Sequence, residues 1–394
     1  MDLDMDFLHD GLPEKILKTN YERPVHPEPD FEQPSDYNEA LKKMLARPNI
    51  ASFEYISRQY DHNVQGGAVI GPVQGKGRVN GAASVTKPVL DSDHAVVCSQ
   101  AVNPSYSYID TYHMAACAID TAIRNTVARG GDIDHMALMD NFCWCSSTEP
   151  GRLGQLKESA RACYEYAVAY GAPYISGKDS MFNDFRGFDA KGEKIKISIA
   201  PTLMASSISV MKDVSKAVSL DPKFAGDLVY IIGETKDELG GSEYFQMHNE
   251  TGNSVPKVDA AKARELYADF KKAIDARLIA SSISPNFGGL GIALAKMAIA
   301  GGLGIRAELS KVPQSGVERD DHLLFSESQS RFIVTVDPKR KEEFEKIFSN
   351  HATAQIGEIT EEKSLKITGT NAEEIINSSI ESLDEAYRST FKNY

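Results

Sequence analysis

The sequence predicts a chain of two domains in the mixed α/β and α+β class. Its 394 residues exceed what one hydrophobic core usually organises. Between residues 94 and 177, strand patterns alternate with helical patterns, as in an α/β module. A second, mixed set of strands and helices begins after residue 214. We therefore expect an N-terminal extension at 1–50, a first domain at 51–213 and a second domain at 214–394.

Hydrophobic periodicity and its breakers predict the elements of the first domain. Residues 65–88 are crowded with glycine and β-forming residues, which indicates short strands and tight turns. Residues 114–129 repeat apolar side chains at helical spacing and stop at a glycine pair. The other expected elements are strands at 94–102, 136–142 and 173–177, a helix at 153–170 and a long β stretch at 194–211.

The second domain is predicted to begin near Val214. The stretch SLDPKFAGDLVYIIGET combines proline, glycine and a new apolar strand, which is typical of the beginning of a new domain. The first fifty residues are rich in Pro, Glu, Asp and Lys with little periodicity, so we expect them to wrap on the body or be loosely tethered. The expected elements of the second domain are helices at 260–277, 289–300, 338–349 and 372–387 and strands at 303–309 and 331–336.

Composition and charge exclude several classes of function. A net charge of -13 argues against binding to nucleic acid or to an anionic membrane. No apolar run approaches 18 residues, and the acidic N-terminus lacks the layout of a secretory signal, so a cytoplasmic protein is expected. Five cysteines without paired C-x-x-C spacing indicate reduced thiols, and the nine histidines show no zinc-ligand spacing.

The stretch YISGKDSMFND at 174–184 suggests a phosphate-binding turn. Gly177 would let a phosphate approach the backbone, Lys178 would add a positive charge, and Ser180 would add a hydroxyl. Asp140 follows the neighbouring predicted strand, at the carboxyl edge where ligands of such sheets collect. The alternatives are a plain turn and a strand-end cap.

Two further motifs have both a binding and a structural interpretation. ELGGSEYF at 238–245 would form either the anion-binding start of a helix or a helix capped by Ser242. FSESQSRF at 325–332 places Glu327 and Arg331 before a strand, where a contact with an anion and a solvated loop are the alternatives.

Taken together, several blocks occur in an order that resembles the C-terminal half of phosphoribosylformylglycinamidine synthase, in the aminoimidazole ribonucleotide synthetase superfamily. The resemblance runs from about residue 52 to about residue 359. It implies a barrel-forming N-terminal α/β domain and a C-terminal α+β domain with a mixed sheet. The blocks are YISRQYDHNVQGG, NPSYSYIDTYHMAACAIDTAIRN, ALMDNFCW, ACYEYAVAYGAPYISGKDSMFND, GDLVYIIGETKDELGGSEYF and LFSESQSRF.

The resemblance also implies a function in purine biosynthesis. ATP with Mg²⁺ activates an amide oxygen of formylglycinamide ribonucleotide, and ammonia then displaces phosphate. Asp140, Gly177 and Ser180 match residues that reach nucleotide and substrate, with Lys178 beside them and Asp140 as the candidate metal ligand. The catalytic histidine and the ATP loop of the family's first half have no counterpart here, so no catalytic residue is assigned. The implied partners are a first-half synthetase subunit and a glutaminase subunit that supplies ammonia.

Large family members have a second nucleotide site that does not turn over, and the resemblance maps it onto five residues. Thr121, Ser284 and Asn286 stand where the family has a Glu, an Asp and a Ser, whereas Asp93 and Asn125 are kept. Losing two carboxylates removes most ligands for a hard cation. We expect this auxiliary nucleotide to be weakly bound or absent, and the site to survive chiefly as packing.

Two classes of function remain open at this stage. One is an enzyme subunit that completes an ATP-dependent carbon–nitrogen ligase with a first-half partner. The other is a non-catalytic scaffold or regulatory paralogue that keeps the fold. The intact GKDS block and Asp140 favour the enzyme, and Thr121 with ISPNFGG favours the paralogue. A pseudo-twofold heterodimer is expected over a homodimer.

Overall fold

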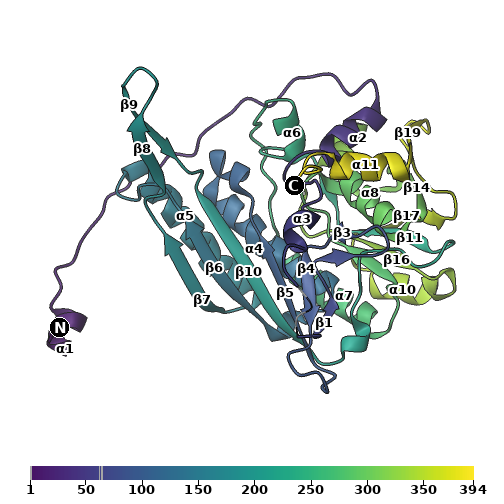
Figure 1. Cartoon of the computed structure of the whole chain (residues 1–394), viewed down its shortest axis with the longest axis horizontal. Helices are drawn as coiled ribbons and strands as arrows, with labels where there is room; N and C mark the ends of the chain where they lie inside the picture. The colour runs from purple at the N-terminus through teal and green to yellow at the C-terminus, as the bar shows by residue number, and fades with distance from the viewer. Residues whose placement is uncertain (1, 62, 64) are drawn as a thin grey trace.

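The computed structural model describes residues 2–61, 63 and 65–394. The block YISRQYDHNVQGG includes His62 and Val64, which lie outside the described residues. Two sheets lie side by side, and helices pack around both of them (Figure 1). No helix among the described residues combines the length and the apolar character needed to cross a bilayer.

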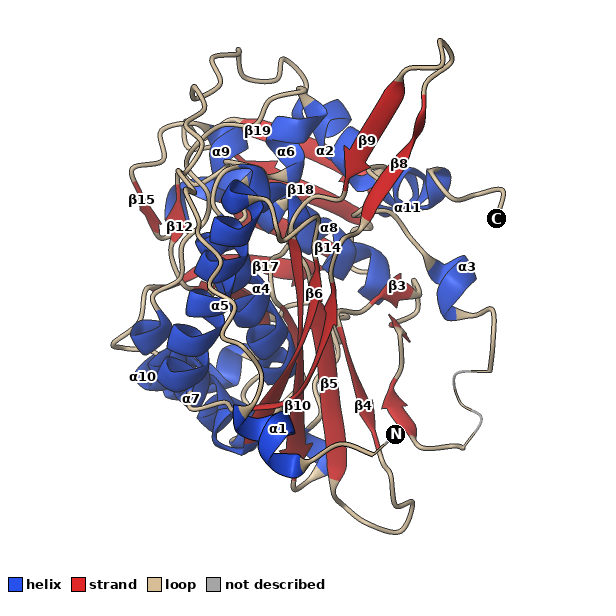
Figure 2. Ribbon diagram, turned by 90° about the vertical axis from the view of Figure 1, so that its left-hand side faces the viewer, coloured by secondary structure: helices blue, strands red, loops and turns tan. Residues whose placement is uncertain are grey.

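The first sheet has six strands in the order β1-β4-β5-β10-β6-β7. β6 and β7 pair in parallel, and the other neighbours pair antiparallel. Two long helices, α4 and α5, lie along one side of these strands (Figure 2). The bounds are β1 Ala68–Ile70, β4 Ala83–Thr86, β5 Ala95–Ala101, β10 Thr202–Met211, β6 Met136–Cys143, β7 Tyr174–Ser180, α4 Thr111–Ala128 and α5 Pro150–Tyr170.

Helix α4 is buried along almost its whole length because it packs between the first sheet and the second domain. Asp110 caps its first turn by accepting a hydrogen bond from the backbone N–H of His113 at 3.1 Å. Small side chains, mostly alanine, let the helix approach β5 and β10 closely. Its polar residues are therefore placed at the junction between the domains, where each one needs a partner.

The second sheet has seven strands in the order β13-β16-β11-β17-β14-β18-β19. Helices α7, α8 and α11 pack around it, and one hydrophobic cluster joins α4 of the first domain to α7 and β16 of the second. The bounds are β11 Leu228–Ile232, β13 Ser281–Ile283, β14 Gly304–Glu308, β16 Phe332–Val336, β17 Thr353–Thr360, β18 Ser364–Thr368, β19 Glu374–Ser379, α7 Ala260–Asp275, α8 Gly289–Gly301 and α11 Ile380–Ser389.

Most predicted elements of both domains are observed, and the last predicted helix is corrected. Residues 374–379 form strand β19, which pairs antiparallel with β18, and only the following residues form α11. Ser379 marks the change because its side chain accepts a hydrogen bond from the backbone N–H of Ser382 and so caps the helix. The helical spacing of Ile380, Leu383 and Tyr387 had been extended too far back.

The predicted N-terminal extension at 1–50 packs on the body at its C-terminal end, through a helix that was not predicted. Helix α2, Tyr37–Leu45, buries Leu41, Met44 and Leu45 in the core of the second domain, against α8 and α11. Leu41, Met44 and Leu45 share one helical face, so the periodicity was present in the sequence and was overlooked. Residues before α2 run along the surface, with α1, Met5–Asp10, far from the body (Figure 1).

Strands β8, Asp184–Phe188, and β9, Lys194–Ser198, form a hairpin that projects from the first sheet (Figures 1 and 2). The hairpin exposes large apolar side chains, with Phe188 at 66% and Ile197 at 60% of full exposure. The remaining elements are α3 Glu54–Ser57, α6 Glu243–Met247, α9 Asp320–Phe325, α10 Lys341–Ile347, β2 Val73–Gln74, β3 Val79–Asn80, β12 Thr235–Lys236 and β15 Gln314–Ser315.

Candidate functional site

The GKDS block is the end of a strand, and the predicted turn is corrected. Residues 177–180 complete β7 and pair in parallel with β6, where Asp140 is opposite Gly177 and Cys143 is opposite Ser180. β7 is the last strand of its sheet, so its outer edge is not paired with another strand of the described chain. The chain turns only after Ser180, where Phe182 takes a positive φ of 60°. The block therefore offers an exposed strand edge in place of a phosphate-binding loop.

The register places the predicted residues on two different faces of the sheet. Neighbouring residues of a strand alternate between faces. Asp140 is in phase with buried Leu138 and Phe142, so it shares the face on which α4 and α5 pack, together with Gly177 and Asp179. Lys178 and Ser180 lie on the opposite face. The predicted residues Asp140, Lys178 and Ser180 therefore lie on neighbouring strands but not on one face of the sheet.

On the open face, the ammonium of Lys178 donates to the hydroxyl of Ser180 at 2.5 Å. Lys178 is exposed and forms no ion pair among the described residues. Lysine and a hydroxyl held together at an exposed edge are suited to a phosphate or carboxylate group, since both can donate to its oxygens.

On the other face, the carboxylate of Asp140 lies directly over Gly177. A Cβ atom at position 177 would be 2.3 Å from Oδ1 of Asp140, which explains the need for glycine here. Burial raises the pKa of Asp140 above its ordinary value, and repulsion from the nearby Asp179 carboxylate adds to the rise. Two carboxylates that repel each other on one face favour the binding of a cation between them.

Metal clusters of three or more ligands are absent from the part of the chain that the structure describes. Mg²⁺ nevertheless often takes only one or two carboxylates from a protein and the rest of its ligands from phosphates and water. Asp140 and Asp179 fit that limited requirement, because they supply two carboxylates beside the same strand edge.

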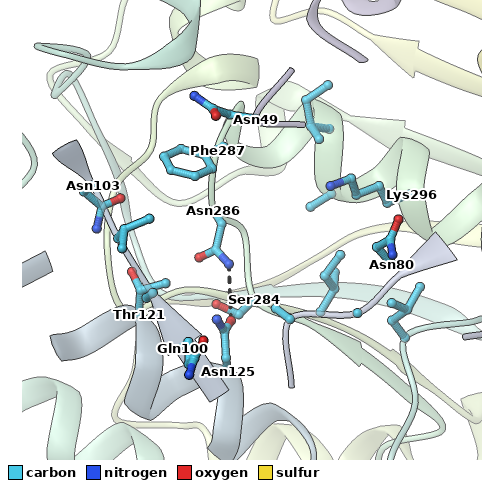
Figure 3. A pocket seen from close by; sticks show the side chains of 18 of the residues that line it. Asn49, Asn80, Gln100, Asn103, Thr121, Asn125, Ser284, Asn286, Phe287 and Lys296 are labelled. Carbon is cyan, nitrogen blue, oxygen red and sulfur yellow. Dashed lines mark hydrogen bonds between the residues drawn. The ribbon is translucent and has the colours of Figure 1, made fainter. Parts of the chain in front are cut away.

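Four of the five auxiliary-site residues meet at a second place, a cavity of about 340 Å³ between the domains (Figure 3). Thr121 and Asn125 come from α4, and Ser284 and Asn286 come from the segment that leads into α8. The structure leaves a cavity at these four residues, and the expectation that the auxiliary nucleotide is weakly bound or absent stays a prediction. Asp93 lies near the opposite end of β5, exposed to solvent, and is not among the lining residues.

The guanidinium of Arg124 is fully buried and contacts two residues of the cavity wall, Ser284 and Asn286. Its five N–H donors go to five acceptors, so its hydrogen bonding is complete. The acceptors are Ser284 Oγ at 2.6 Å, Asp120 Oδ2 at 2.6 Å, Gln329 Oε1 at 2.5 Å, Pro285 O at 2.9 Å and Asn286 Oδ1 at 2.7 Å. The side-chain oxygens of Ser284 and Asn286 are therefore directed at a protein cation.

The carboxylate of Asp120 completes this cluster. Arg124 and Asp120 form an ion pair in which both side chains have no exposed surface. The other Asp120 oxygen accepts from the hydroxyls of Tyr170 and Tyr267, each at 2.5 Å. Such a pair is stable only when its remaining hydrogen bonds are satisfied, as they are here. The cluster joins α4 and α5 of the first domain to α7 of the second.

The other two motifs have structural roles. Ser242 caps α6 by accepting from the N–H of Phe245, as the structural interpretation of ELGGSEYF expected. The FSESQSRF segment is buried, so its expected solvated loop is corrected. Glu327 accepts hydrogen bonds from Tyr106, from Gly288 N at 2.9 Å and from Glu243 N at 3.0 Å. Burial raises the pKa of Glu327 to about 7.

Sequence reasoning missed Arg124, Asp120 and Lys296. A signal existed for each, because charged residues inside otherwise apolar helical patterns need a buried partner or a ligand. Arg124 and Asp120 are four residues apart, the spacing of a helical ion pair. Lys296 stands alone in GLGIALAKMAIAG, which forms the buried helix α8.

Two regions of the chain match known protein families. Residues 80–203 match the family described as AIR synthase related protein, N-terminal domain. Residues 225–370 match the family described as AIR synthase related protein, C-terminal domain. The N-terminal match covers most of the six-stranded sheet, and the C-terminal match covers most of the seven-stranded sheet.

Among curated proteins, the chain is similar to phosphoribosylformylglycinamidine synthase subunits named PurL. The subunit of Thermococcus sibiricus is 32% identical over 92% of this chain and 47% of that protein. The subunit of Methanocaldococcus jannaschii is 30% identical over 99% of this chain and 51% of that protein. The chain thus spans about half the length of these curated relatives.

Solved structures support the same fold. PurL of Thermotoga maritima complexed with FGAR superposes with a TM-score of 0.68 at 18% identity, over 89% of this chain and 54% of that one. The hydrogenase maturation protein HypE of E. coli gives a TM-score of 0.51 at 16% identity, over 72% of this chain and 84% of that one. The resemblance found in the sequence is confirmed by these matches. The chain belongs to the AIR synthase related proteins and contains both of the domains that define them.

Proposed function

We propose that this chain is the second-half synthetase unit of a phosphoribosylformylglycinamidine synthase in purine biosynthesis. Together with a first-half unit it would complete an ATP-dependent site that converts formylglycinamide ribonucleotide and ammonia to the amidine. The similarity to PurL subunits supports the reaction class. The observation that carries the proposal is the unpaired edge of β7, where Lys178 and Ser180 are held together on an exposed face.

In this proposal the two faces of β7 have different tasks. Lys178 and Ser180 bind the phosphate of the ribonucleotide, since both donate hydrogen bonds to anionic oxygens. Asp140 and Asp179 would hold the Mg²⁺ that accompanies ATP, which would relieve the repulsion between their carboxylates. Bound ATP supplies the phosphoryl group that activates the amide. Gly177 leaves room for the carboxylate of Asp140, since a Cβ at position 177 would lie 2.3 Å from its Oδ1.

The exposed apolar side chains of the β8–β9 hairpin favour a partner chain or domain. Phe185, Phe188 and Ile197 are each more than half exposed on an arm that projects beyond the sheet. A first-half synthetase unit is the partner that the incomplete site requires, and a glutaminase unit would supply ammonia. We expect the completed assembly to be a cytoplasmic, heteromeric ligase.

The test is ADP formation that depends on ammonium, formylglycinamide ribonucleotide and ATP. The chain is assayed alone and then mixed with a candidate first-half unit. Activity only in the mixture would support the proposal, and Lys178→Ala should then raise the KM for the ribonucleotide at least tenfold. Ser176→Ala, on the same strand, is the matched control and should leave that KM unchanged.

A non-catalytic scaffold is the second candidate, and the altered auxiliary site favours it. Thr121, Ser284 and Asn286 provide no carboxylate at the place where the family resemblance implies metal ligands. A stable complex with the first-half unit that forms no ADP would support this scaffold over the ligase.

A further inference from the structure

The β8–β9 hairpin carries basic side chains on one face and apolar side chains on the other. Antiparallel pairing places Arg186 opposite Lys196 and Phe188 opposite Lys194. Since neighbouring residues of a strand point to opposite faces, the residues between them form a second face. The basic face carries Arg186, Lys194 and Lys196 together with Phe188, and the apolar face carries Phe185, Ile195 and Ile197.

The basic face is only partly neutralised within the described chain. Like charges directly opposite each other weaken a strand pair, and Arg186 and Lys196 are such a pair. Lys196 forms ion pairs with Glu149 and Asp184 at the base of the hairpin, whereas Arg186 and Lys194 form none among the residues described. An acidic segment on this face would therefore relieve the repulsion and pair the remaining cations.

The hairpin also lacks a neighbouring strand. β8 and β9 pair only with each other in the described chain, so the outer edge of β9 presents backbone N–H and C=O groups without strand partners. An isolated two-stranded hairpin is marginally stable, and a third strand that covers its apolar face stabilises it. The edge of β9 therefore suits an added strand with acidic side chains on one face and apolar side chains on the other.

Residues 2–7, the sequence DLDMDF, have this pattern. Acidic and apolar residues alternate with a period of two, which is the period of a strand. Residues 194–197 of β9, the sequence KIKI, alternate in the same way with the opposite charge. If the two segments pair as neighbouring strands, the aspartates lie beside the lysines, and the apolar side chains of Leu3, Met5 and Phe7 lie beside the isoleucines.

The segment is held only weakly in the conformation that the structure shows. Residues 5–10 form helix α1, which buries none of its residues, and Met5 and Phe7 are 61% and 45% exposed. A helix this short is marginal in water, because starting a helix fixes several residues for one hydrogen bond. Residues 2–17 contain five carboxylates and one lysine, so a basic surface attracts them. The segment can therefore exchange its helix for a strand at small cost.

The N-terminal arm is anchored beside the base of the hairpin. The hydroxyl of Thr19 donates to the carbonyl of Pro150 at 2.7 Å, and the preceding residue, Glu149, pairs with Lys196 of β9. Figure 1 shows the trace rising from α1 and passing the base of this hairpin. When extended, the chain from Phe7 to Thr19 spans roughly 40 Å, whereas a five-residue strand such as β9 is about 17 Å long. The segment can therefore reach the whole of β9.

We propose that residues 2–7 of the chain add to the outer edge of β9 as a third strand. In this docked state the three aspartates lie on the basic face of the hairpin, and the apolar residues between them cover Ile195 and Ile197. The added strand also pairs an edge that would otherwise be open to other chains. This inference concerns the hairpin and does not depend on ligase activity.

The test is backbone hydrogen exchange of the full chain at low ionic strength. The amides of β9 that point away from β8 should be protected. Changing Asp2, Asp4 and Asp6 together to lysine should speed their exchange by at least about tenfold. Adding Arg186→Glu and Lys194→Glu to that variant should restore the protection, because the charges of both segments are then exchanged. Asp10→Lys with Glu14→Lys is the matched control and should leave the exchange of β9 unchanged.

Four outcomes would overturn the proposal. They are rapid exchange of the outer β9 amides in the full chain, protection that survives the triple lysine change, protection that the control variant also loses, and protection that rises with protein concentration. The last would assign the added strand to a second copy of the chain. Residues 2–7 lie outside both hydrophobic cores, so the variants should fold, and an unchanged unfolding temperature checks this. Because neither the ribonucleotide nor a first-half unit is present, these results are independent of the proposed ligase function.

Discussion

The edge of β7 and the Arg124 cluster differ in how far their charged side chains are buried and paired within the chain. At Arg124, each donor and each neighbouring carboxylate oxygen has a protein partner, and both members of the ion pair are fully buried. At β7, Lys178 is exposed and contacts only a hydroxyl, while Asp140 and Asp179 repel each other. The comparison indicates that charged side chains whose hydrogen bonds are all made within the chain hold the two domains together. Charged side chains that lack such partners are available to bind a ligand.

The largest expected effect is a loss of stability on breaking the Arg124 cluster. Arg124→Ala leaves Asp120 as a buried unpaired charge, so the free energy of unfolding should fall by about 3–5 kcal/mol. Arg161→Ala is the matched control, since Arg161 pairs with Glu165 at the same helical spacing but on the surface. That control should cost less than about 1 kcal/mol. Urea unfolding measures both, and similar losses in the two variants would contradict the comparison.

The next effect is expected at the edge of β7, on the Mg²⁺ requirement of the assembled enzyme. Gly177→Ala forces the Asp140 carboxylate to move, because the added Cβ would lie 2.3 Å from its Oδ1. The Mg²⁺ concentration needed for half-maximal ADP formation should rise about tenfold, which corresponds to about 1.4 kcal/mol. The KM for the ribonucleotide should change less. If the KM for the ribonucleotide changes more than the Mg²⁺ requirement, the assignment of the two faces is wrong.

The last expected effect is confined to the pH dependence of stability at the domain junction. Glu327 has a folded pKa of about 7, above its ordinary 4.5, so the folded chain binds this proton more tightly than the unfolded chain does. Its contribution is therefore present at low pH and is lost as pH rises from about 4.5 to about 7. Glu327→Gln keeps the uncharged form, since the amide can accept from Gly288 and donate to Tyr106.

The measurement is the unfolding free energy of both proteins at pH 5 and at pH 8. Glu327→Gln should match the parent at pH 5 and exceed it at pH 8 by on the order of 2 kcal/mol. A parent and variant that respond equally to pH would show that Glu327 is already ionised in the folded chain at pH 5.

Local patterns predicted most of the fold but not the ends of its elements. The helices at 114–129 and 153–170 were recognised because apolar spacing and glycine stops agree there. The strand ending at Ser180 was cut short because Gly177 and Asp179 are typical of turns, and only pairing with β6 extends the strand past them. The strand at 374–379 depends in the same way on pairing with β18.

The candidate site was less predictable because side-chain partners are distant in sequence. Asp140 and Lys178 were both selected from the sequence, yet the face that each occupies depends on the register between β6 and β7. Arg124 contacts Ser284, 160 residues away, a pairing that no local pattern reveals. The cavity itself is a property of the domain junction and could be seen only once both domains were placed.

Helix α2 has a consequence for how the chain folds. Asn38, at the start of α2, accepts a hydrogen bond from the backbone N–H of Asn377, 339 residues later, and the same helix packs against α11. The apolar face of α2 therefore has no partner on α8 until residues 289–301 have been made, and it is fully covered only once α11 follows. Contacts at such a separation form late and slow the folding reaction. During that interval Leu41, Met44 and Leu45 are an exposed apolar segment that a chaperone could bind.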